Sequence, residues 1–578
     1  MDDNHFNSTR RYDPEAIAKY YRYRPWLVIW RFLVIVLSFA SFLLGVLWDK
    51  WQYDKVEDTP ERATQLRKIL TRLGPTFIKV GQALSTRPDL IRKDFLEELT
   101  KLQDQLPPFD NKKAISIIET ELGQNINNIY SEISPRPVAA ASLGQVYQAR
   151  LRSGEIVAVK VQRPNLLPII TLDLFLMRWS ASWLAPWLPL NLGHDLSLIV
   201  DEFGTKLFEE IDYINEGQNA ERFATYFADD PSVKVPSIYW RYTTIHVLTL
   251  EWIDGLKLLD TEQIKAAGLD TDTLITVGVT SGLRQLLEFG FFHADPHPGN
   301  LFALKDGRMA YIDFGMMDQL EQDTKETLVD SVIHLINKDY QELAKDFVKL
   351  GFLAPDVDIQ PIVPALEIVL GNIMGEKVKD FNFKTITDKF SELMFEYPFR
   401  VPAKFALIIR SLVTEEGLAL SLNPNFRIVD IAYPYVARRL LKGESPALRR
   451  RLIEVLFKDG KFQWQRLENL IGIAQTDQNF DILPTAQLGL QYLLSEEGEF
   501  LRKKLILAMV EDDRIHTEEV SRLWGLIQDD FQPSRLFNIA LGALAEFSTQ
   551  RATAILPSVM AMTNSQTRSQ ESGVRSQN

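Results

Sequence analysis

The chain has 578 residues, of which 46% are hydrophobic and 24% charged, a composition typical of a globular protein with two or three folded units. Its net charge of −13 argues against a general nucleic-acid binder, which carries a basic surplus, so we expect no nucleic-acid partner. The chain has no cysteine, which excludes disulfides, thiolate metal sites and thiol nucleophiles.

Residues 1–55 are expected to form a flexible N-terminus followed by an apolar helix. Arg31 is the only charged residue between Trp26 and Trp48, and aromatic residues gather at both ends of this stretch. A helix over these residues rises roughly 33 Å, enough for the hydrocarbon core of a bilayer, and aromatic side chains prefer its two interfaces. No small-residue cleavage site follows the segment, which argues against a signal peptide. The pattern predicts a membrane-associated helix, and a buried helix in a soluble protein is the alternative.

The charges beside this helix conflict with a simple crossing. Basic residues outnumber acidic ones between positions 10 and 31, and such an end stays in the cytoplasm. A single crossing would then place the rest of the chain away from ATP. The helix therefore lies in the interface, or enters and returns, or breaks the rule. In each case we expect the catalytic region to face the cytoplasm or an equivalent side that contains ATP.

Helical spacing of apolar residues continues from about 60 to 122, and two strands joined by a turn follow at 146–150 and 155–161. The apolar, tryptophan-rich stretch 172–192 is either a core helix running into a loop or a face that touches a membrane or partner. Further elements are predicted in chain order: a long helix at 195–228, a strand at 244–252, a helix at 271–289, two short strands around 305–307, and mainly helix beyond 320.

Lys160 ends the predicted strand at 155–161, where a buried ammonium needs a carboxylate or phosphate partner. The segment upstream holds small residues, which let a backbone approach a phosphate, and it lies where a protein kinase carries its glycine-rich loop. Alanine should make this loop stiffer than glycine does. The loop residues predicted to contact a nucleotide are Val138, Ala139, Ala140, Ala141, Ser142, Leu143, Gly144, Gln145 and Val146.

Two acidic motifs follow in the order of a kinase. Asp295 and Asn300 have the spacing of the catalytic aspartate and metal-binding asparagine of the kinase catalytic loop, and Asp313 begins an Asp-Phe-Gly triplet. We therefore predict Asp295 as the catalytic residue, Asn300 and Asp313 as ligands of Mg²⁺, and ATP or ADP as the nucleotide. His293 and His297 offer an alternative metal site, but the prolines between and after them forbid a regular helix, which favours a role in bracing the loop.

Two further features of the site are predicted from position: the acidic partner of Lys160 and the hinge. The acidic partner of Lys160 should come from the helix at 195–228, where Glu209, Glu210, Asp212 and Glu216 are candidates. The backbone groups of Glu251 and Ile253 lie where a kinase hinge binds the adenine edge.

The sequence resembles the AarF/UbiB family of atypical kinases over roughly residues 60–430. The resemblance is carried by the K-x-G-Q motif with Lys79 and Gln82, the alanine-rich loop, the E-x-D pair and the segment 293–300. It implies that Lys79 and Gln82 fold over the nucleotide site, with Lys79 meeting Glu210 or Asp212, and that Lys160 pairs with Glu216.

The resemblance also implies an α+β, protein-kinase-like two-lobed fold with an N-terminal helical extension and a mainly helical C-terminal region. The expected parts after residue 55 are a helical extension at 56–130, an N-lobe at 131–255, a C-lobe at 256–435, a helical region at 436–565 and a disordered tail at 566–578.

The family is linked to isoprenoid quinone biosynthesis, and it has membrane-associated members. No A-P-E anchor for a peptide follows Asp313, which makes protein phosphorylation a poor fit. We therefore expect an atypical kinase or ATPase that supports ubiquinone- or plastoquinone-type synthesis, or prenyl-lipid metabolism, at a membrane. Expected partners are a membrane lipid or prenyl-quinone precursor, a second copy of the chain, or quinone-biosynthesis proteins. The alternatives are a nucleotide-binding pseudokinase scaffold and a Ser/Thr protein kinase.

Overall fold

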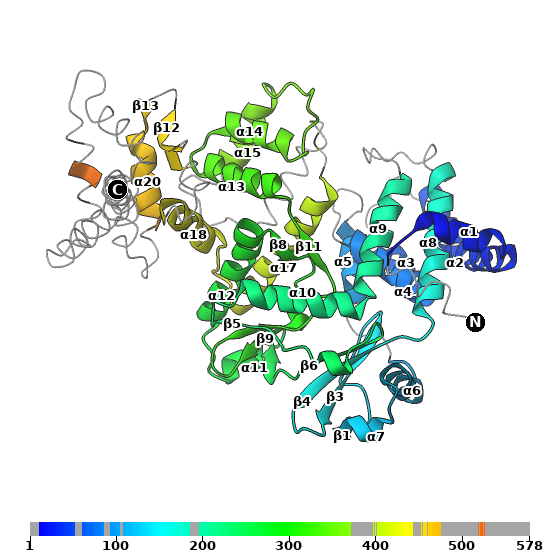
Figure 1. Ribbon diagram of the computed structural model, residues 1–578. Helices are drawn as coiled ribbons and strands as arrows, with labels where there is room; N and C mark the ends of the chain where they lie inside the picture. The colour runs from blue at the N-terminus through cyan, green and yellow to red at the C-terminus, as the bar shows by residue number, and fades with distance from the viewer. Residues whose placement is uncertain are drawn as a thin grey trace, which may run out of the picture. The chain divides into compact units, whose positions relative to one another are not determined.

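The computed structural model describes residues 11–52, 60–85, 93–103, 108–184, 196–371 and 401–442, together with short stretches between 397 and 525 (Figure 1). The chain divides into two compact units, residues 1–329 with 340–428, and residues 330–339 with 429–578. The predicted tail at 566–578 and most of the predicted helical region at 436–565 lie outside the described residues.

A group of N-terminal helices opens the first unit. The side chain of Asp13 accepts hydrogen bonds from the backbone of Glu15 and Ala16, and Pro14 fills the first turn, so the chain enters α1 with both helix-start signals satisfied. The helices are α1 (Pro14–Arg22), α2 (Pro25–Gln52), α3 (Pro60–Leu73), α4 (Pro75–Leu84), α5 (Lys93–Thr100), α6 (Asn111–Leu122) and α7 (Ile126–Ile129). In Figure 1 α1 to α5 gather beside α8 (Leu166–Leu184) and α9 (Leu196–Glu210).

An antiparallel sheet follows, with the strand order β1-β3-β4-β6 and β2 paired to β3. Its strands are β1 (Tyr130–Ile133), β2 (Ala139–Ala140), β3 (Gly144–Leu151), β4 (Ile156–Gln162) and β6 (Val247–Glu251). Val157, Val159 and Val161 alternate along β4 and are fully buried against α6 and α7. Lys160 lies on the opposite face of the strand, because successive side chains point to opposite sides.

The helix predicted at 195–228 is interrupted, and the prediction of one long helix was wrong. Asp212 has extended backbone angles, and its side chain accepts hydrogen bonds from Ile214 and Asn215, so a new helix, α10 (Tyr213–Tyr226), begins there. An aspartate in this conformation is a strong helix-start signal that apolar periodicity alone does not reveal.

A second sheet has the order β5-β10-β9-β7 and supports the loops of the C-terminal lobe. Its strands are β5 (Val233–Lys234), β10 (Met309–Tyr311), β9 (Leu301–Leu304) and β7 (Gly255–Lys257). A short antiparallel pair, β8 (Phe291–His293) and β11 (Met317–Gln319), flanks β9 and β10 in the sequence. The helices of this lobe are α11 (Thr261–Ala266), α12 (Thr271–Arg284) with the π-helical turn η5 (Gln285–Phe289), α13 (Gln322–Ile336), α14 (Tyr340–Lys349), α15 (Ile362–Gly371) and α17 (Ala403–Leu422).

The second unit contains α18 (Val429–Lys442), a hairpin of β12 (Phe457–Lys458) and β13 (Lys461–Phe462), and α20 (Trp464–Ala474). Within this unit Arg466 is ion-paired with Asp339 at 3.2 Å. The hairpin is an exception to the mainly helical structure expected beyond residue 320.

Candidate active site

Lys160 is held by a carboxylate from α10. Its Nζ lies 2.8 Å from both carboxylate oxygens of Glu216 and 3.7 Å from Oδ1 of Asp313. Glu216 is 1% exposed. The structure therefore brings together the strand lysine, one of its four candidate acidic partners and the aspartate of the Asp-Phe-Gly triplet.

The charges of this cluster are strongly coupled. Burial disfavours the ammonium of Lys160, but the carboxylates of Asp313 and Glu216 outweigh it and hold the pKa of Lys160 well above its usual value. Burial also opposes ionisation of Asp313, yet the Lys160 charge and the Gly315 N–H keep the pKa of Asp313 below its usual range. Burial raises the pKa of Glu216, against the attraction of Lys160. The lysine stays cationic and Asp313 stays anionic at neutral pH.

Asn300 lies beside the aspartate. Its amide nitrogen donates to Oδ2 of Asp313 at 3.3 Å, and its backbone oxygen accepts from the N–H of Ile312 at 3.2 Å. These contacts join the loop after β8 to the end of β10. The two residues predicted as Mg²⁺ ligands are thus neighbours in space.

His293 fastens the same two segments together. Its Nδ1 accepts from the N–H of Asp295 at 3.1 Å, so its Nε2 carries the proton and donates to the carbonyl of Asp313 at 2.8 Å. Burial lowers the pKa of His293, which keeps the ring neutral. Nδ1 of His297 accepts from the N–H of Gly299. Among the described residues no group of three His, Asp or Glu side chains is placed to hold a metal ion. The hydrogen bonds of the His293 and His297 rings fit the predicted role of bracing the loop.

Asp295 has a partner that sequence reasoning missed. Nη2 of Arg410, on α17, lies 2.6 Å from Oδ1 of Asp295, and the Arg410 side chain is only 6% exposed. One feature of the sequence could have pointed to Arg410, because it is the only charged residue between Phe405 and Val413. An arginine in such an apolar helix needs a buried acid, but the identity of that acid is set by the fold.

The alanine-rich segment is a tight hairpin. Ala139 and Ala140 pair with β3, and the N–H of Ala141 donates to the carbonyl of Gly144 at 2.8 Å. A Cβ at Gly144 would lie 2.6 Å from the carbonyl oxygen of Val161, so only glycine allows the two strands to approach this closely.

The other residues of the predicted phosphate loop differ in where their side chains lie. Val146 packs with Ala158 and Leu250 on the face of the sheet that carries Lys160. Leu143 and Ser142 are buried. Gln145 is fully buried and bonds to the N–H of Phe109, so its side chain points away from a nucleotide. Val138 is half exposed, and its N–H donates to the carbonyl of Val146.

The K-x-G-Q motif lies on α4, and its two polar side chains diverge. Lys79 donates to the carboxylate of Glu210, whose pKa is raised by burial despite this lysine. A Cβ at Gly315 would lie 3.4 Å from Cγ of Glu210, which places this ion pair against the Asp-Phe-Gly turn. Gln82 is 8% exposed and donates to the carbonyl of Leu102, within the N-terminal helices. Lys79 therefore reaches the site, and Gln82 does not. Asp212, its other candidate partner, instead caps α10 as described above.

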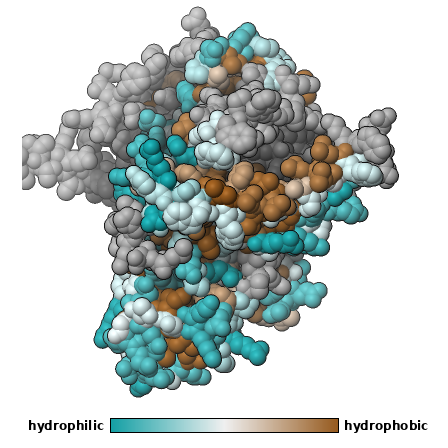
Figure 2. All heavy atoms as spheres, turned by 90° about the vertical axis from the view of Figure 1, so that its right-hand side faces the viewer, coloured by the Kyte–Doolittle hydropathy of each residue, from teal (hydrophilic) through white to brown (hydrophobic). Residues whose placement is uncertain are grey.

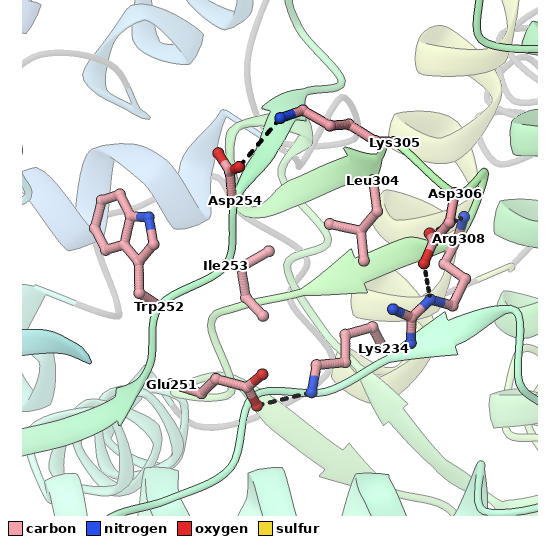
Figure 3. A pocket seen from close by; sticks show the side chains of 9 residues that line it. All are labelled: Lys234, Glu251, Trp252, Ile253, Asp254, Leu304, Lys305, Asp306 and Arg308. Carbon is pink, nitrogen blue, oxygen red and sulfur yellow. Dashed lines mark hydrogen bonds and ion pairs between the residues drawn. The ribbon is translucent and has the colours of Figure 1, made fainter. Parts of the chain in front are cut away.

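The predicted hinge borders a separate cavity of about 280 Å³. Figure 3 shows Glu251 turned toward Lys234, with which it is ion-paired at 2.7 Å. The N–H of Glu251 donates to the carbonyl of Ser237, which removes it as a donor for an adenine edge. Neither Lys160 nor Asp313 lines this cavity. Its lining residues are Lys234, Glu251, Trp252, Ile253, Asp254, Leu304, Lys305, Asp306 and Arg308.

Comparison with known proteins settles the family. The ABC1 atypical kinase-like domain matches residues 101–347, and the UbiB helical domain matches residues 366–427. An uncharacterised protein of Synechocystis is 67% identical over 95% of this chain and 97% of its own length. This chain belongs to the ABC1/UbiB family of atypical kinases. The resemblance stated from the sequence motifs is thereby confirmed.

Other members of the family extend to plants. The protein named activity of BC1 complex kinase 1, chloroplastic, of Arabidopsis thaliana is 50% identical over 84% of this chain and 74% of its own length. A solved structure titled as Rv3197 with erythromycin, from Mycobacterium tuberculosis, matches 61% of this chain and 90% of that one at 27% identity, with a TM-score of 0.44. The family assignment and the two sheets with their helices confirm the predicted α+β kinase-like fold with its N-terminal helical extension.

Proposed function

We propose that this ABC1/UbiB family member binds ATP or ADP with Mg²⁺ and acts as an atypical kinase or ATPase in prenyl-quinone or prenyl-lipid metabolism at a membrane. The observation that carries the proposal is Lys160, held between Glu216 and Asp313 on the inner face of the N-terminal sheet. A largely buried lysine fixed in this way presents its remaining N–H to an anion, and kinases use that arrangement to hold nucleotide phosphates.

The residues of the site suit a magnesium ion that is shared with a nucleotide. Asp313 and Asn300 supply a carboxylate and an amide oxygen, and Mg²⁺ takes one or two such ligands beside water and phosphate oxygens. Burial raises the pKa of Glu210 and Glu216, and the charge of Asp313 adds to the rise in both. When bound, the metal would neutralise the phosphate oxygens of the nucleotide.

We assign the remaining roles as follows. Lys160 donates to a phosphate oxygen, and Glu216 fixes the direction of its ammonium. Asp295 orients an acceptor hydroxyl or water and accepts its proton. Arg410 positions Asp295. Lys79, through Glu210, holds α4 against the Asp-Phe-Gly turn.

The surroundings of the site favour a small acceptor over a peptide. Only six residues separate Gly315 from the first residue of α13, and three of them form β11. Arg410 occupies one oxygen of Asp295. Water or the hydroxyl of a prenylated phenol therefore suits the site better than a protein chain. The names of the Arabidopsis relatives, which call them kinases, support phosphotransfer. Quinone-biosynthesis proteins are proposed as partners on the family resemblance alone.

The proposal is tested by measuring the hydrolysis of ATP by the purified chain. We expect Mg²⁺-dependent turnover that increases when vesicles and a prenylated phenol are added, and that is lost in Asp313→Asn. Transfer of labelled phosphate to added proteins would instead identify a protein kinase. Nucleotide binding with no turnover under any condition would identify a pseudokinase scaffold. Failure to bind any nucleotide would refute the proposal.

A further inference from the structure

Helix α2 exposes its apolar side chains, whereas an amphipathic helix of a soluble protein buries them. Ten of its large apolar side chains are exposed, and their spacing of three and four residues places them on one face, which we call the outer face of α2. The exposed fractions reach 70% at Leu37 and 68% at Leu44. The outer face consists of Trp26, Ile29, Trp30, Leu33, Val36, Leu37, Leu43, Leu44, Leu47 and Trp48. Figure 2 looks onto this side of the molecule and shows apolar residues gathered in a band across it.

Two charged residues of α2, Arg31 and Asp49, point toward the protein. Arg31 donates to both carboxylate oxygens of Asp173, on α8, at 2.7 and 2.9 Å. Asp49 accepts from Arg62, on α3, at 2.6 and 3.0 Å. Gly45 leaves room for the Arg62 guanidinium, which a Cβ there would meet. Arg31 and Asp49 are therefore paired within the protein, and the ten large side chains exposed on the outer face are apolar.

A helix packed in this way cannot cross a bilayer alone. Arg31 also donates to the carbonyl of Leu73 at 2.6 Å, so α3 runs antiparallel beside α2 between the contacts at Arg62 and Leu73. Helix α3 carries Arg67, Lys68 and Arg72 as well. A bilayer that surrounded α2 would enclose these charges, and each costs about 2.5–3.5 kcal/mol at the bilayer centre. Only the outer face is available to hydrocarbon.

The composition of the outer face suits an interface. Tryptophans lie at both ends, where an indole ring places its apolar body in hydrocarbon and its N–H among headgroups. Trp179 of α8 is half exposed and packs edge-on against Phe32, with ring centroids 5.8 Å apart, which widens the apolar surface. Arg22, next to the helix start, is exposed and suits anionic lipid headgroups.

We propose that the outer face of α2, widened by Trp179, docks flat on a lipid bilayer, so that the protein binds one leaflet and does not cross. This deepens the membrane location in the proposed function and rests on it. It also removes the conflict with the positive-inside rule, since a helix in the interface puts no part of the chain on the far side.

The absence of cysteine makes the orientation directly measurable. Ile29, Leu37 and Leu47 are replaced one at a time by cysteine and labelled with an environment-sensitive fluorophore. The labelled proteins are bound to vesicles of phosphatidylcholine and phosphatidylglycerol. Lipids that carry quenchers at known depths then report the depth of each position. A helix lying flat gives the same shallow depth at all three. A deep Leu37 between two shallow ends would show a crossing helix and overturn the proposal.

Vesicle binding provides the second test. The double substitution Leu37→Glu with Leu44→Glu should weaken binding at least about a hundredfold, because two exposed leucines no longer enter the bilayer. The matched control replaces Ile156 and Ile368, which are also exposed but lie outside α2, with glutamate and should bind like the wild type. Equal loss of vesicle binding in both variants would overturn the proposal. Unchanged vesicle binding of the α2 variant, together with loss of a dimer, would also overturn it, because the outer face would then contact a second copy of the chain. ATP hydrolysis without lipid is measured in parallel, so a failed docking proposal leaves the nucleotide site tested separately.

Discussion

The contact between Arg410 and Asp295 gives the sharpest prediction, because both residues lie at the site and only one was found from sequence. Replacing Arg410 with methionine keeps the bulk of the side chain and removes its charge. Loss of one partner from a buried ion pair costs about 3–5 kcal/mol. Because the Asp295 side chain is 20% exposed, water solvates part of the remaining carboxylate, so we expect a loss of about 2 kcal/mol.

A double-variant cycle isolates this contribution. The free energy of unfolding is measured in urea for wild type, Arg410→Met, Asp295→Asn and the double variant. We expect a coupling of about 2 kcal/mol, with the double variant more stable than Arg410→Met. The pair Arg308–Asp306 is the matched control, since it has a similar distance of 2.8 Å but is about half exposed, and it should couple by less than about 1 kcal/mol. A coupling near zero for Arg410 would refute the buried ion pair.

Kinetics of Arg410→Met distinguish a role in orienting Asp295 from a role in binding the nucleotide. If Arg410 orients Asp295, Arg410→Met should lower kcat by at least about tenfold and leave nucleotide affinity unchanged. Arg410→Lys should recover part of the rate because it retains the charge. An unchanged kcat in Arg410→Met would contradict the positioning role.

Three further outcomes are expected. Ala140→Gly should loosen the hairpin at β2 and change the ratio of ATP to ADP affinity, and an unchanged ratio in a binding titration would contradict this. Burial raises the pKa of Glu415 to about 8, so the stability from its neutral form is present below its unfolded pKa and is lost as pH rises through 8. Between about pH 5 and pH 8 the melting temperature of the wild type should therefore fall relative to Glu415→Gln and then level off, and parallel curves would contradict the buried acid. Lys79→Met should destabilise the protein by stranding the Glu210 carboxylate, and adding Glu210→Gln should restore part of the loss; a double variant as unstable as Lys79→Met alone would speak against the pair.

The sequence predicted those parts of the site that depend on local spacing. Asp295, Asn300 and Asp313 lie within one short segment around β9 and β10, so their order along the chain nearly determines their proximity. The direction of Lys160 follows from strand alternation. The family resemblance supplied the choice of Glu216 among four acidic candidates.

The rest depends on contacts between distant segments. Arg410 follows Asp295 by 115 positions, and no local pattern connects α17 to the loop after β8. The resemblance implied that Gln82 folds over the nucleotide site with Lys79, but its hydrogen bond to the carbonyl of Leu102 holds it within the N-terminal helices. The break at Asp212 shows a capping signal overriding apolar periodicity. The sequence predicted an apolar helix between Trp26 and Trp48, but only the neighbouring helices show which side of α2 stays exposed.

The central claim is that Lys160, Asp313 and Asn300 form a Mg²⁺-nucleotide site. It is tested most directly by the melting temperature of the wild type and Asp313→Asn, each with and without saturating Mg²⁺ and ATP. A ligand at a hundred times its Kd stabilises a protein by about 2.7 kcal/mol, so we predict a clear rise in the wild type that requires Mg²⁺ and is absent in Asp313→Asn. An equal rise in both proteins would contradict the claim.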